Sequence, residues 1–359
     1  MRVAVLADIH GNLPALEAVL DDIKRQSPDF ICAAGDLALR GAFPAETVDL
    51  LEATCDSLLM GNTDCYIAGH YLSGAYRDPD HWKTELLQWT RAQLGPERVK
   101  RLGELPFSVR YTPRKGSDLF VCHANPRNLE ESLEPTLDEH QLRRFIGHLD
   151  AAAVAFGHLH FPYRRRVGRM VIADVASAGI PRDGDLRPAW GLFTFTPRGW
   201  RVQIRRVRYT VRKATQALLD RKVPGAPLLI HKMLEARYRH HGLLADAARK
   251  HSGLPPYLRP PPGAPASLKP VGLPPPSSPR PPPGEVPPPG ESTQADEAAD
   301  ELLLHASLHT ETPDTETPDT ESPGREGAAP RPLGGDENQG DQGDAPISGE
   351  APAPAVTET

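Results

Sequence analysis

Short apolar runs alternate with amphipathic stretches along the first sixty residues. The run RVAVLA at 2–7 is apolar after its first residue, which is typical of a strand buried on both faces of a parallel sheet. The stretch 13–24 instead places leucine, alanine, valine and isoleucine at helical spacing. The same order repeats with a strand at 29–34, a helix at 45–53 and a strand at 57–60. This rhythm predicts an α/β fold built on a parallel sheet.

The pattern further along the chain predicts a second sheet and more helices. The expected strands are 108–112, 118–123, 152–156, 163–175, 190–196 and 200–210, and the expected helices are 80–102, 137–149, 211–222 and 227–240. Tight turns join the last three strand regions, which favours an antiparallel second sheet. The predicted architecture is a two-sheet β-sandwich flanked by helices. We expect the helix that begins near residue 80 to pack in the core, with a lid over a binding site as the alternative.

Composition divides the chain into three parts. Of its 40 prolines, 25 lie beyond residue 251, where apolar alternation and aromatic residues also fade. We therefore predict a folded domain at 1–210, a short helical extension packing on it at 211–250, and a long disordered tail at 251–359. One tail segment, DEAADELLLHASLHT at 296–310, fits a short amphipathic helix. A transient helix is the simpler interpretation, and docking to another protein is the alternative.

Charge and cysteine content narrow the setting of the protein. The net charge of −6 gives no general argument for binding to nucleic acid or to a membrane surface. Four cysteines without a CxxC pair favour a reduced, cytoplasmic location over a disulfide framework. No apolar run reaches the roughly 18 residues that cross a bilayer, and the N-terminal run is too short for a signal peptide. The oligomeric state is not indicated.

Several predicted strands end in a polar residue that can bind a metal ion. These residues are Asp8, His10, Asp36, Asn62, His123, His158 and His160. Polar groups after parallel strands gather beyond the carboxyl edge of a sheet. A lone Asp or His at such a position is more often a helix cap or a surface residue, but five strand ends in order favour a shared site.

The residue types suit a pair of divalent ions. Imidazole and carboxylate bind Mn, Fe or Zn in preference to Ca, and one carboxylate can bridge both ions. The alternate spacing of Asp8 with His10, and of His158 with His160, would place both members on one side of an extended strand end. Glycines before the ligands, at 35, 61 and 157, are expected to supply unusual backbone angles.

These motifs resemble those of the calcineurin-like metallophosphoesterase superfamily. DIHGN at 8–12, GD at 35–36, GNTD at 61–64, His123 in VCHANP and GHLH at 157–160 match it in order and spacing. The compact bacterial phosphodiesterase branch is the most similar, because it also carries a PRDGD segment, here 181–185. The resemblance covers residues 1–210.

The resemblance implies two metal ions and hydrolysis of phosphate esters. One ion would be held by Asp8, His10, Asp36 and His160, and the other by Asp36, Asn62, His123 and His158, so that Asp36 bridges. A hydroxide held between the ions would attack phosphorus. Mn is the expected metal, with Fe, Zn, Ni, Co or Mg as alternatives.

The motif GNTD departs from the pattern of many superfamily members. There the third residue is a histidine that protonates the leaving group, and here Thr63 replaces it. A threonine hydroxyl is no general acid near neutral pH, so we expect phosphodiester or nucleotide-like substrates, including cyclic nucleotides and aryl diesters. Asp64 and His70 are candidate substitutes for the missing acid.

Other functions stay open. The basic stretches 164–166 and 201–213 fit a solvated sheet face or a track for a polynucleotide, which would suit a nuclease on DNA or RNA ends. Arg182 is a candidate phosphate contact. GDLALRG at 35–41 only partly matches the GDxVDRG motif of the superfamily's protein phosphatases. The last alternative is a non-catalytic interaction scaffold, which the intact ligand set disfavours.

Overall fold

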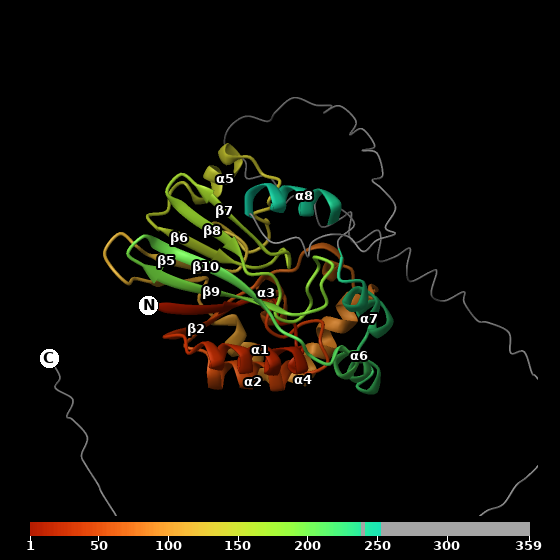
Figure 1. The fold of residues 1–359 in the computed structure, drawn as a ribbon. Coiled ribbons are helices and arrows are strands. Elements are labelled where there is room, and N and C mark those ends of the chain that lie inside the picture. Colours follow the sequence, from red (N-terminus) through yellow and green to blue (C-terminus); the bar gives the residue numbers. More distant parts are fainter. Residues whose placement is uncertain (238–240, 253–359) are drawn as a thin grey trace, which may run out of the picture. The chain divides into compact units, whose positions relative to one another are not determined.

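The computed structural model describes residues 1–237 and 241–252 (Figure 1). Its strands are β1 (Arg2–Leu6), β2 (Phe30–Ala34), β3 (Ser57–Leu59), β4 (Ser108–Tyr111), β5 (Leu119–Cys122), β6 (Ala153–Phe156), β7 (Tyr163–Val167), β8 (Met170–Asp174), β9 (Ala189–Thr196) and β10 (Gly199–Arg206). They form two five-stranded sheets, ordered β10-β9-β1-β2-β3 and β4-β5-β6-β8-β7. In the first sheet β1, β2 and β3 run parallel, and in the second β5, β6 and β8 do.

Helices cover the outer face of each sheet. They are α1 (Leu13–Gln26), α2 (Pro44–Thr54), α3 (Asn62–Ala68), the 3-10 turn η1 (Gly74–Arg77), α4 (Trp82–Gly103), α5 (Glu139–Ile146), α6 (Val211–Asp220), α7 (Ala226–Glu235) and α8 (His241–Ser252). In Figure 1, α1, α2 and α4 lie under the first sheet, and α5 and α8 lie beside the second. The predicted two-sheet sandwich with flanking helices is confirmed.

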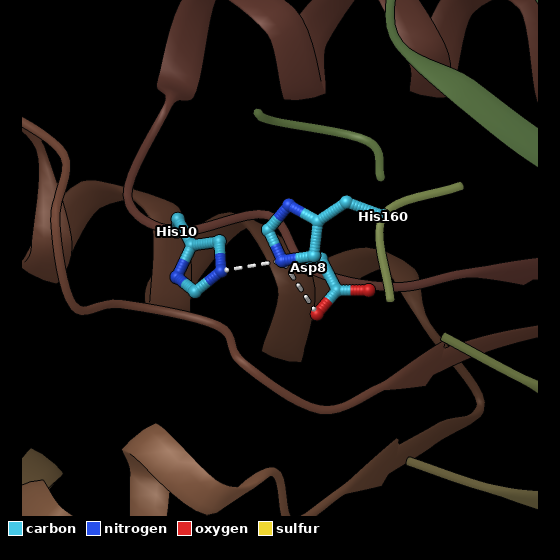
Figure 2. Close-up of side chains that lie close together, drawn as sticks. All are labelled: Asp8, His10 and His160. Carbon is cyan, nitrogen blue, oxygen red and sulfur yellow. Dashed lines mark hydrogen bonds and ion pairs between the residues drawn. The ribbon is translucent and has the colours of Figure 1, made fainter. Parts of the chain in front are cut away.

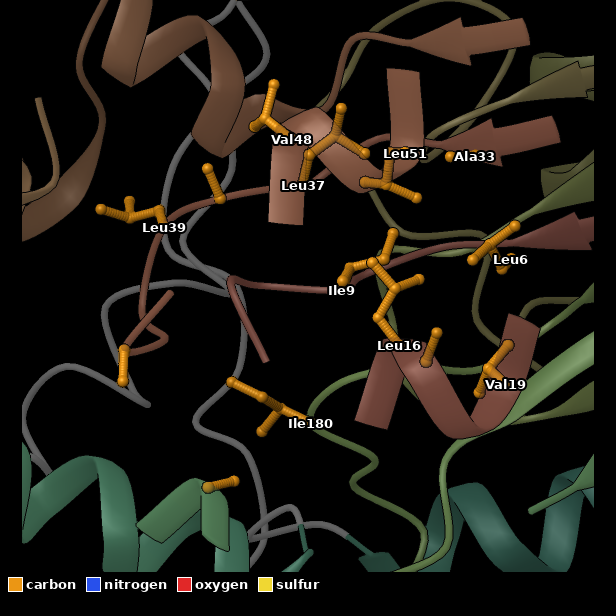
Figure 3. Close-up of a cluster of buried hydrophobic side chains, with 14 of the residues drawn as sticks. Leu6, Ile9, Leu16, Val19, Ala33, Leu37, Leu39, Val48, Leu51 and Ile180 are labelled. Carbon is orange, nitrogen blue, oxygen red and sulfur yellow. The ribbon is translucent and has the colours of Figure 1, made fainter. Parts of the chain in front are cut away.

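Alternation along the strands divides the buried side chains between the layers. On β1, Ala4 and Leu6 pack against the helices, whereas Val3 and Val5 face the second sheet. Figure 3 shows the helix-side core, where Leu6 lies close to Leu16 and Val19 of α1. Strands buried on both faces have few polar positions, which is why the sequence shows them as continuous apolar runs.

The prediction that all the later strands form one antiparallel second sheet is wrong. The β9–β10 hairpin joins the first sheet, where β9 pairs antiparallel with β1 and Val3 lies opposite Phe193. Of the strands predicted after residue 160, only β7 and β8 join the second sheet, and that sheet is mixed. Sequence neighbours pair readily through short turns, but the sheet that receives a hairpin depends on contacts distant in sequence.

The helices after residue 210 are part of this packing. Ala214, Leu218 and Met233 of α6 and α7 belong to the core under the first sheet, and Leu244 of α8 packs with the outer face of the second. Helix α7 ends earlier than expected, and α8 was not predicted. The rest of the predicted tail, including the segment 296–310, lies outside the described residues.

Helix α4 packs as core. Its Leu86 and Leu94 are buried, and Trp82 and Trp89 pack against the same cluster, which confirms the core interpretation over a lid. The helix is interrupted at Gly95, where φ is 74°, immediately before Pro96. Proline removes a backbone donor and clashes with the preceding turn, so a break at this point is expected.

Candidate metal centre

The structure brings all seven predicted ligands together at one edge of the two sheets. They follow the carboxyl ends of β1, β2, β3, β5 and β6. Each of the seven side chains has a polar atom within 3.5 Å of a polar atom of another. All except His158 are buried, with exposed fractions of 6% or less. Two parallel regions, one in each sheet, therefore build a single polar cluster between them.

The first group of the cluster contains Asp8, His10 and His160 (Figure 2). The Nε2 atoms of His10 and His160 lie 3.2 Å apart, and His160 Nε2 lies 3.2 Å from Asp8 Oδ1. That carboxylate oxygen is buried and has no hydrogen-bond partner among the described residues. Its other oxygen accepts the main-chain N–H of His158 at 2.8 Å.

The second group contains Asn62, His123 and His158. His123 Nε2 lies 3.2 Å from Asn62 Oδ1 and 3.2 Å from His158 Nδ1. Asp36 stands between the groups, because its two oxygens lie 3.5 Å from His10 Nε2 and 3.5 Å from His123 Nε2. Asp8, Asp36 and His123 are also close enough to share an ion.

Every histidine of the cluster is oriented by a main-chain carbonyl. His10 Nδ1 bonds Leu39 O at 2.8 Å, His123 Nδ1 bonds Ala34 O at 2.9 Å, His160 Nδ1 bonds Ile180 O, and His158 Nε2 bonds Glu130 O at 2.9 Å. A carbonyl only accepts, so each of these nitrogens carries the ring proton. In the neutral ring the opposite nitrogen holds a lone pair that points into the cluster, as in metal-bound imidazoles.

This donor chemistry fits divalent cations. When both rings of a pair are neutral, two lone pairs lie 3.2 Å apart and repel each other unless a positive ion lies nearby. Burial and the neighbouring Arg40 hold the pKa of His10 well below its usual range, and burial and His123 lower the pKa of His158 to about 4. Both rings are therefore neutral at pH 7, the form that binds metals.

The backbone around the cluster adopts conformations that side chains rarely allow. Of ten non-glycine residues with positive φ in the described part, six lie here: Asp8, His10, Asp36, Arg40, His158 and His160. Their φ values run from 51° to 88°, each at a cost of about 1–3 kcal/mol. The expected extended strand ends are wrong, since left-handed residues re-aim these side chains. Strain of this kind concentrates at functional sites.

The glycines before the ligands act through close approach more than through backbone angle. Gly35 has the expected positive φ of 88°, but Gly61 has a φ of −102°. A Cβ on Gly61 would lie 2.2 Å from the Asp36 main-chain nitrogen, and one on Gly157 would lie 2.5 Å from Asp8 Oδ2. These two glycines bring separate strand ends close enough to share a cluster.

Asp64 and Thr63 lie behind the cluster, fully buried. The Asp64 carboxylate accepts the main-chain N–H groups of Asp36, Leu37 and Gly61, at 2.8, 3.0 and 2.9 Å. Burial and Asp36 raise the pKa of Asp64 to about 7, against the lowering effect of these N–H donors. The Thr63 N–H donates to Asp36 Oδ1 at 2.9 Å, and its hydroxyl has no partner among the described residues.

Four further polar residues at this edge were not singled out as site residues by their motifs. Arg40 is near the first group. Burial lowers the pKa of its guanidinium, but Tyr76 and Asp36 outweigh this effect, so that the pKa is raised overall. Tyr66 and Glu130 contact the second group. Asp174 is buried at the end of β8, where burial and Asp8 raise its pKa. The strand-end pattern that found the seven candidate ligands applies equally to Asp174.

Other predicted contacts lie elsewhere or act through the backbone. His70 is exposed and contacts the Gly103 carbonyl at 2.9 Å. The main-chain N–H of Arg182 donates to His160 O at 3.1 Å, so the PRDGD loop holds the backbone of a candidate ligand. A phosphate contact by the Arg182 side chain stays a prediction.

The basic stretches line a groove of about 1010 Å³ between the edge strands β7 and β10. Its arginines are Arg164, Arg165, Arg166, Arg198 and Arg201. Thr194 pairs with both Arg2 and Arg201, so this part of the hairpin lies beside the start of β1. Asp8 follows the other end of β1, about 20 Å away for six residues of strand. The hairpin end of the groove is therefore remote from the sheet edge that carries the candidate ligands.

Two findings bear on location. No helix in the described ranges is long and apolar enough to cross a membrane. All four cysteines, which fall within those ranges, are free. The cytoplasmic location stays a prediction.

Comparison with known proteins finds similarity over the first part of the chain. Residues 1–162 match the family model described as calcineurin-like phosphoesterase. An uncharacterized protein of the archaeon Methanocaldococcus jannaschii is 28% identical over 239 residues, which are 62% of this chain and 93% of that protein. Because this relative is archaeal, the bacterial branch suggested by the motifs stays a prediction.

Two solved structures share the fold. A metallophosphoesterase from Sphaerobacter thermophilus has a TM-score of 0.55 and 25% identity, covering 66% of this chain and 99% of its own. A hypothetical protein from Pyrococcus horikoshii OT3 has a TM-score of 0.56 and 22% identity, covering 66% of this chain and 98% of its own. The first supports the family, and the second supports the fold alone.

Proposed function

We propose that the chain, whose residues 1–162 match the calcineurin-like phosphoesterase family model, hydrolyses phosphodiester bonds with two divalent metal ions. The observation that carries the proposal is the two facing pairs of imidazole nitrogens, His10 with His160 and His123 with His158. Main-chain carbonyls fix a lone pair on each inner nitrogen, and two such pairs side by side suit two cations.

The two groups of the cluster define the two ion sites. Asp8, His10, Asp36 and His160 would hold one ion, and Asp36, Asn62, His123 and His158 would hold the other. Asp36 is the shared carboxylate, because its oxygens lie at equal distances from the two imidazole groups. Mixed imidazole and carboxylate donors favour Mn, with Fe, Zn, Ni, Co or Mg as alternatives.

The reaction would use this charge arrangement directly. Two divalent ions would lower the pKa of water enough to supply hydroxide near neutral pH and would offset the phosphate charge. Two carboxylates, Asp8 and Asp36, leave net positive charge in the cluster once both ions bind. Arg40, with its left-handed backbone and its proximity to His10 and Asp36, would add a guanidinium for a phosphate oxygen.

The preference for diesters rests on the absence of a proton donor in the motif GNTD. Thr63 cannot protonate a leaving alkoxide, and both oxygens of Asp64 accept main-chain N–H groups. A substrate whose leaving group needs no protonation would therefore react fastest, which favours aryl diesters and nucleotide-like phosphodiesters over alkyl monoesters. Loss of a general acid costs about 10²–10⁴-fold for poor leaving groups.

A nuclease is the second candidate function. The arginine groove between β7 and β10 has the charge to bind a polynucleotide. Its hairpin end lies beside the start of β1, away from the metal edge, so it does not form a direct path to the ions. A small or nucleotide-like substrate is the simpler proposal. A protein phosphatase is disfavoured by Thr63 and by Leu39, and a scaffold is disfavoured by the complete donor set.

The test combines metal content with turnover. Purified protein should bind two equivalents of Mn²⁺ and hydrolyse an aryl phosphodiester faster than an alkyl phosphomonoester. Asp36→Asn should remove most metal binding and activity, whereas Asp49→Asn, an exposed residue paired with Arg98, should change neither. Activity that survives in Asp36→Asn would contradict the shared-carboxylate assignment. Absence of both metal and turnover with several divalent ions would favour the scaffold.

A further inference from the structure

A short chain of hydrogen bonds links a candidate metal ligand to a carboxylate outside the ligand set. Asn62 and Tyr66 are one turn apart on α3, and Asn62 Nδ2 donates to the Tyr66 hydroxyl at 3.1 Å. The same hydroxyl donates to Glu130 Oε1 at 2.5 Å. Tyr66 is 2% exposed, so water does not compete freely for either bond.

The amide of Asn62 has two orientations, and without an ion the rotated one satisfies more of its hydrogen bonds. In one, Oδ1 faces His123 Nε2 at 3.2 Å. In the other, rotated orientation, Nδ2 would donate to the Asp36 oxygens at 3.2 and 3.3 Å, and Oδ1 would accept from Tyr66. Only the first orientation points a lone pair towards the ion. The rotated one satisfies the amide by itself and offers the ion no ligand at this position.

The single proton of the tyrosine hydroxyl decides between them. A phenol has one hydrogen to donate, and a carboxylate at 2.5 Å is a stronger acceptor than an amide oxygen. With that proton committed to Glu130, Tyr66 can only accept from Asn62. The amide must then present its NH₂ group to Tyr66 and its oxygen to the cluster.

Glu130 also acts on a second ligand of the same ion. Its main-chain carbonyl accepts from His158 Nε2 at 2.9 Å, which leaves Nδ1 as the inner nitrogen. Asn128 Oδ1 accepts the main-chain N–H groups of Glu130 and Glu131, at 3.1 and 2.8 Å, and so fixes this loop.

We propose that Glu130 and Tyr66 are positioning residues for the second ion, and that Glu130, through Tyr66, holds Asn62 with its oxygen towards that ion. This inference rests on the proposed two-metal function. Removal of such orienting partners typically weakens metal affinity about 10–100-fold.

Calorimetric and EPR titration of metal-free protein with Mn²⁺ tests the proposal without relying on activity. Wild type should bind two ions. Tyr66→Phe and Glu130→Ala should weaken one binding step about 10–100-fold and leave the other unchanged. Glu130→Gln, whose amide oxygen still accepts, should lose less. Tyr111→Phe, which removes another buried hydroxyl, bonded to Ser57 in the described structure, should keep both affinities.

An Asn62→Asp background separates orientation from general loss of structure. A carboxylate presents an oxygen in either orientation, so Tyr66→Phe should have little further effect on metal affinity there. An equal loss in both backgrounds would overturn the orienting role. Two wild-type affinities in Tyr66→Phe would overturn it too while leaving the two-metal function intact, whereas wild-type protein that binds no Mn²⁺ would reject the proposed function itself.

Discussion

The carboxylate of Asp64 accepts the main-chain N–H of Asp36 at 2.8 Å, so the fourth residue of GNTD anchors the loop that carries the proposed shared ligand. Its oxygens also accept from Leu37 and Gly61, which joins the loops after β2 and β3. Gly61 carries no Cβ to separate these loops. The motif therefore supplies a candidate ligand, a close approach and an anchor within four residues.

Asp64→Asn should destabilise the protein instead of changing its choice of substrate. An amide has one acceptor oxygen where the carboxylate has two, and its NH₂ group would face buried N–H donors. We expect a loss of about 2–4 kcal/mol in the free energy of unfolding, measured by urea denaturation, together with weaker metal binding. A folded, metal-loaded variant with a selective loss of turnover for alkyl esters would instead identify Asp64 as a proton donor.

Thr63→Val should leave turnover nearly unchanged. The Thr63 hydroxyl is buried and has no hydrogen-bond partner among the described residues, so its removal breaks no observed bond. We expect kcat for an aryl diester to stay within about threefold and the stability to change by less than about 1 kcal/mol. A fall of about 10²-fold or more, the size of a general-acid effect, would show that the hydroxyl takes part in the reaction.

Thr63→His should shift the substrate preference towards esters with poor leaving groups, such as alkyl monoesters. The new imidazole would supply a general acid, and the ratio of kcat/KM for an alkyl ester to that for the matching aryl ester should rise by up to about 10²-fold. Circular dichroism and metal content must accompany the assay, because the position is 0% exposed and has to accept a larger side chain. An unchanged ratio in a folded, metal-loaded variant would refute the leaving-group argument.

Asp22→Asn should lower the free energy of unfolding at neutral pH. The variant should also lose less stability than wild type when the pH falls. Arg205 holds the pKa of Asp22 below its usual range through hydrogen bonds at 2.8 and 3.0 Å, and Trp190 adds another. A lowered folded pKa stabilises the protein above the unfolded value near 3.9, and this contribution disappears as pH falls through the folded pKa. We expect a loss of about 1–2 kcal/mol at pH 7, since the Arg205 side chain is 24% exposed and water screens the pair.

Urea denaturation of both proteins between pH 7 and pH 3 measures this effect. The difference between wild type and Asp22→Asn should be constant down to about pH 4 and should shrink below it. Asp21→Asn, at the exposed neighbouring position on α1, is the matched control and should have little effect. A difference that grows in acid would have the wrong sign for this pair.

The double variant Arg198→Ser with Arg201→Ser should leave hydrolysis of a small aryl diester within about twofold of wild type. Both residues line the groove beside the start of β1, remote from the metal edge. Turnover of a single-stranded oligonucleotide, measured from 50 to 200 mM salt, provides the contrast. A steep salt dependence that the double variant abolishes would support the nuclease alternative and a polynucleotide track.

The seven candidate ligands could be found from sequence because each depends on a local signal. An apolar run predicts a buried strand, and a polar residue directly after it predicts a position at the carboxyl edge. The same rule applied to β8 would have added Asp174. The sequence also showed the glycines before these ligands, but it did not show why glycine is needed there. Gly61 and Gly157 are required by contacts with Asp36 and Asp8, which only folding brings close.

The tertiary structure decided what depends on partners distant in sequence. The β9–β10 hairpin joins the first sheet because Val3 lies opposite Phe193, a pairing that no local pattern contains. Asp64 anchors a loop because its carboxylate oxygens accept from N–H groups 27 and 28 residues earlier in the chain. Glu130 is linked to Asn62 through Tyr66, which lies 64 residues before Glu130. Sequence alone determined which side chains can bind metal, since hydrophobic periodicity is local. Their orientation, protonation and support came from long-range hydrogen bonds, which only the closed fold can form.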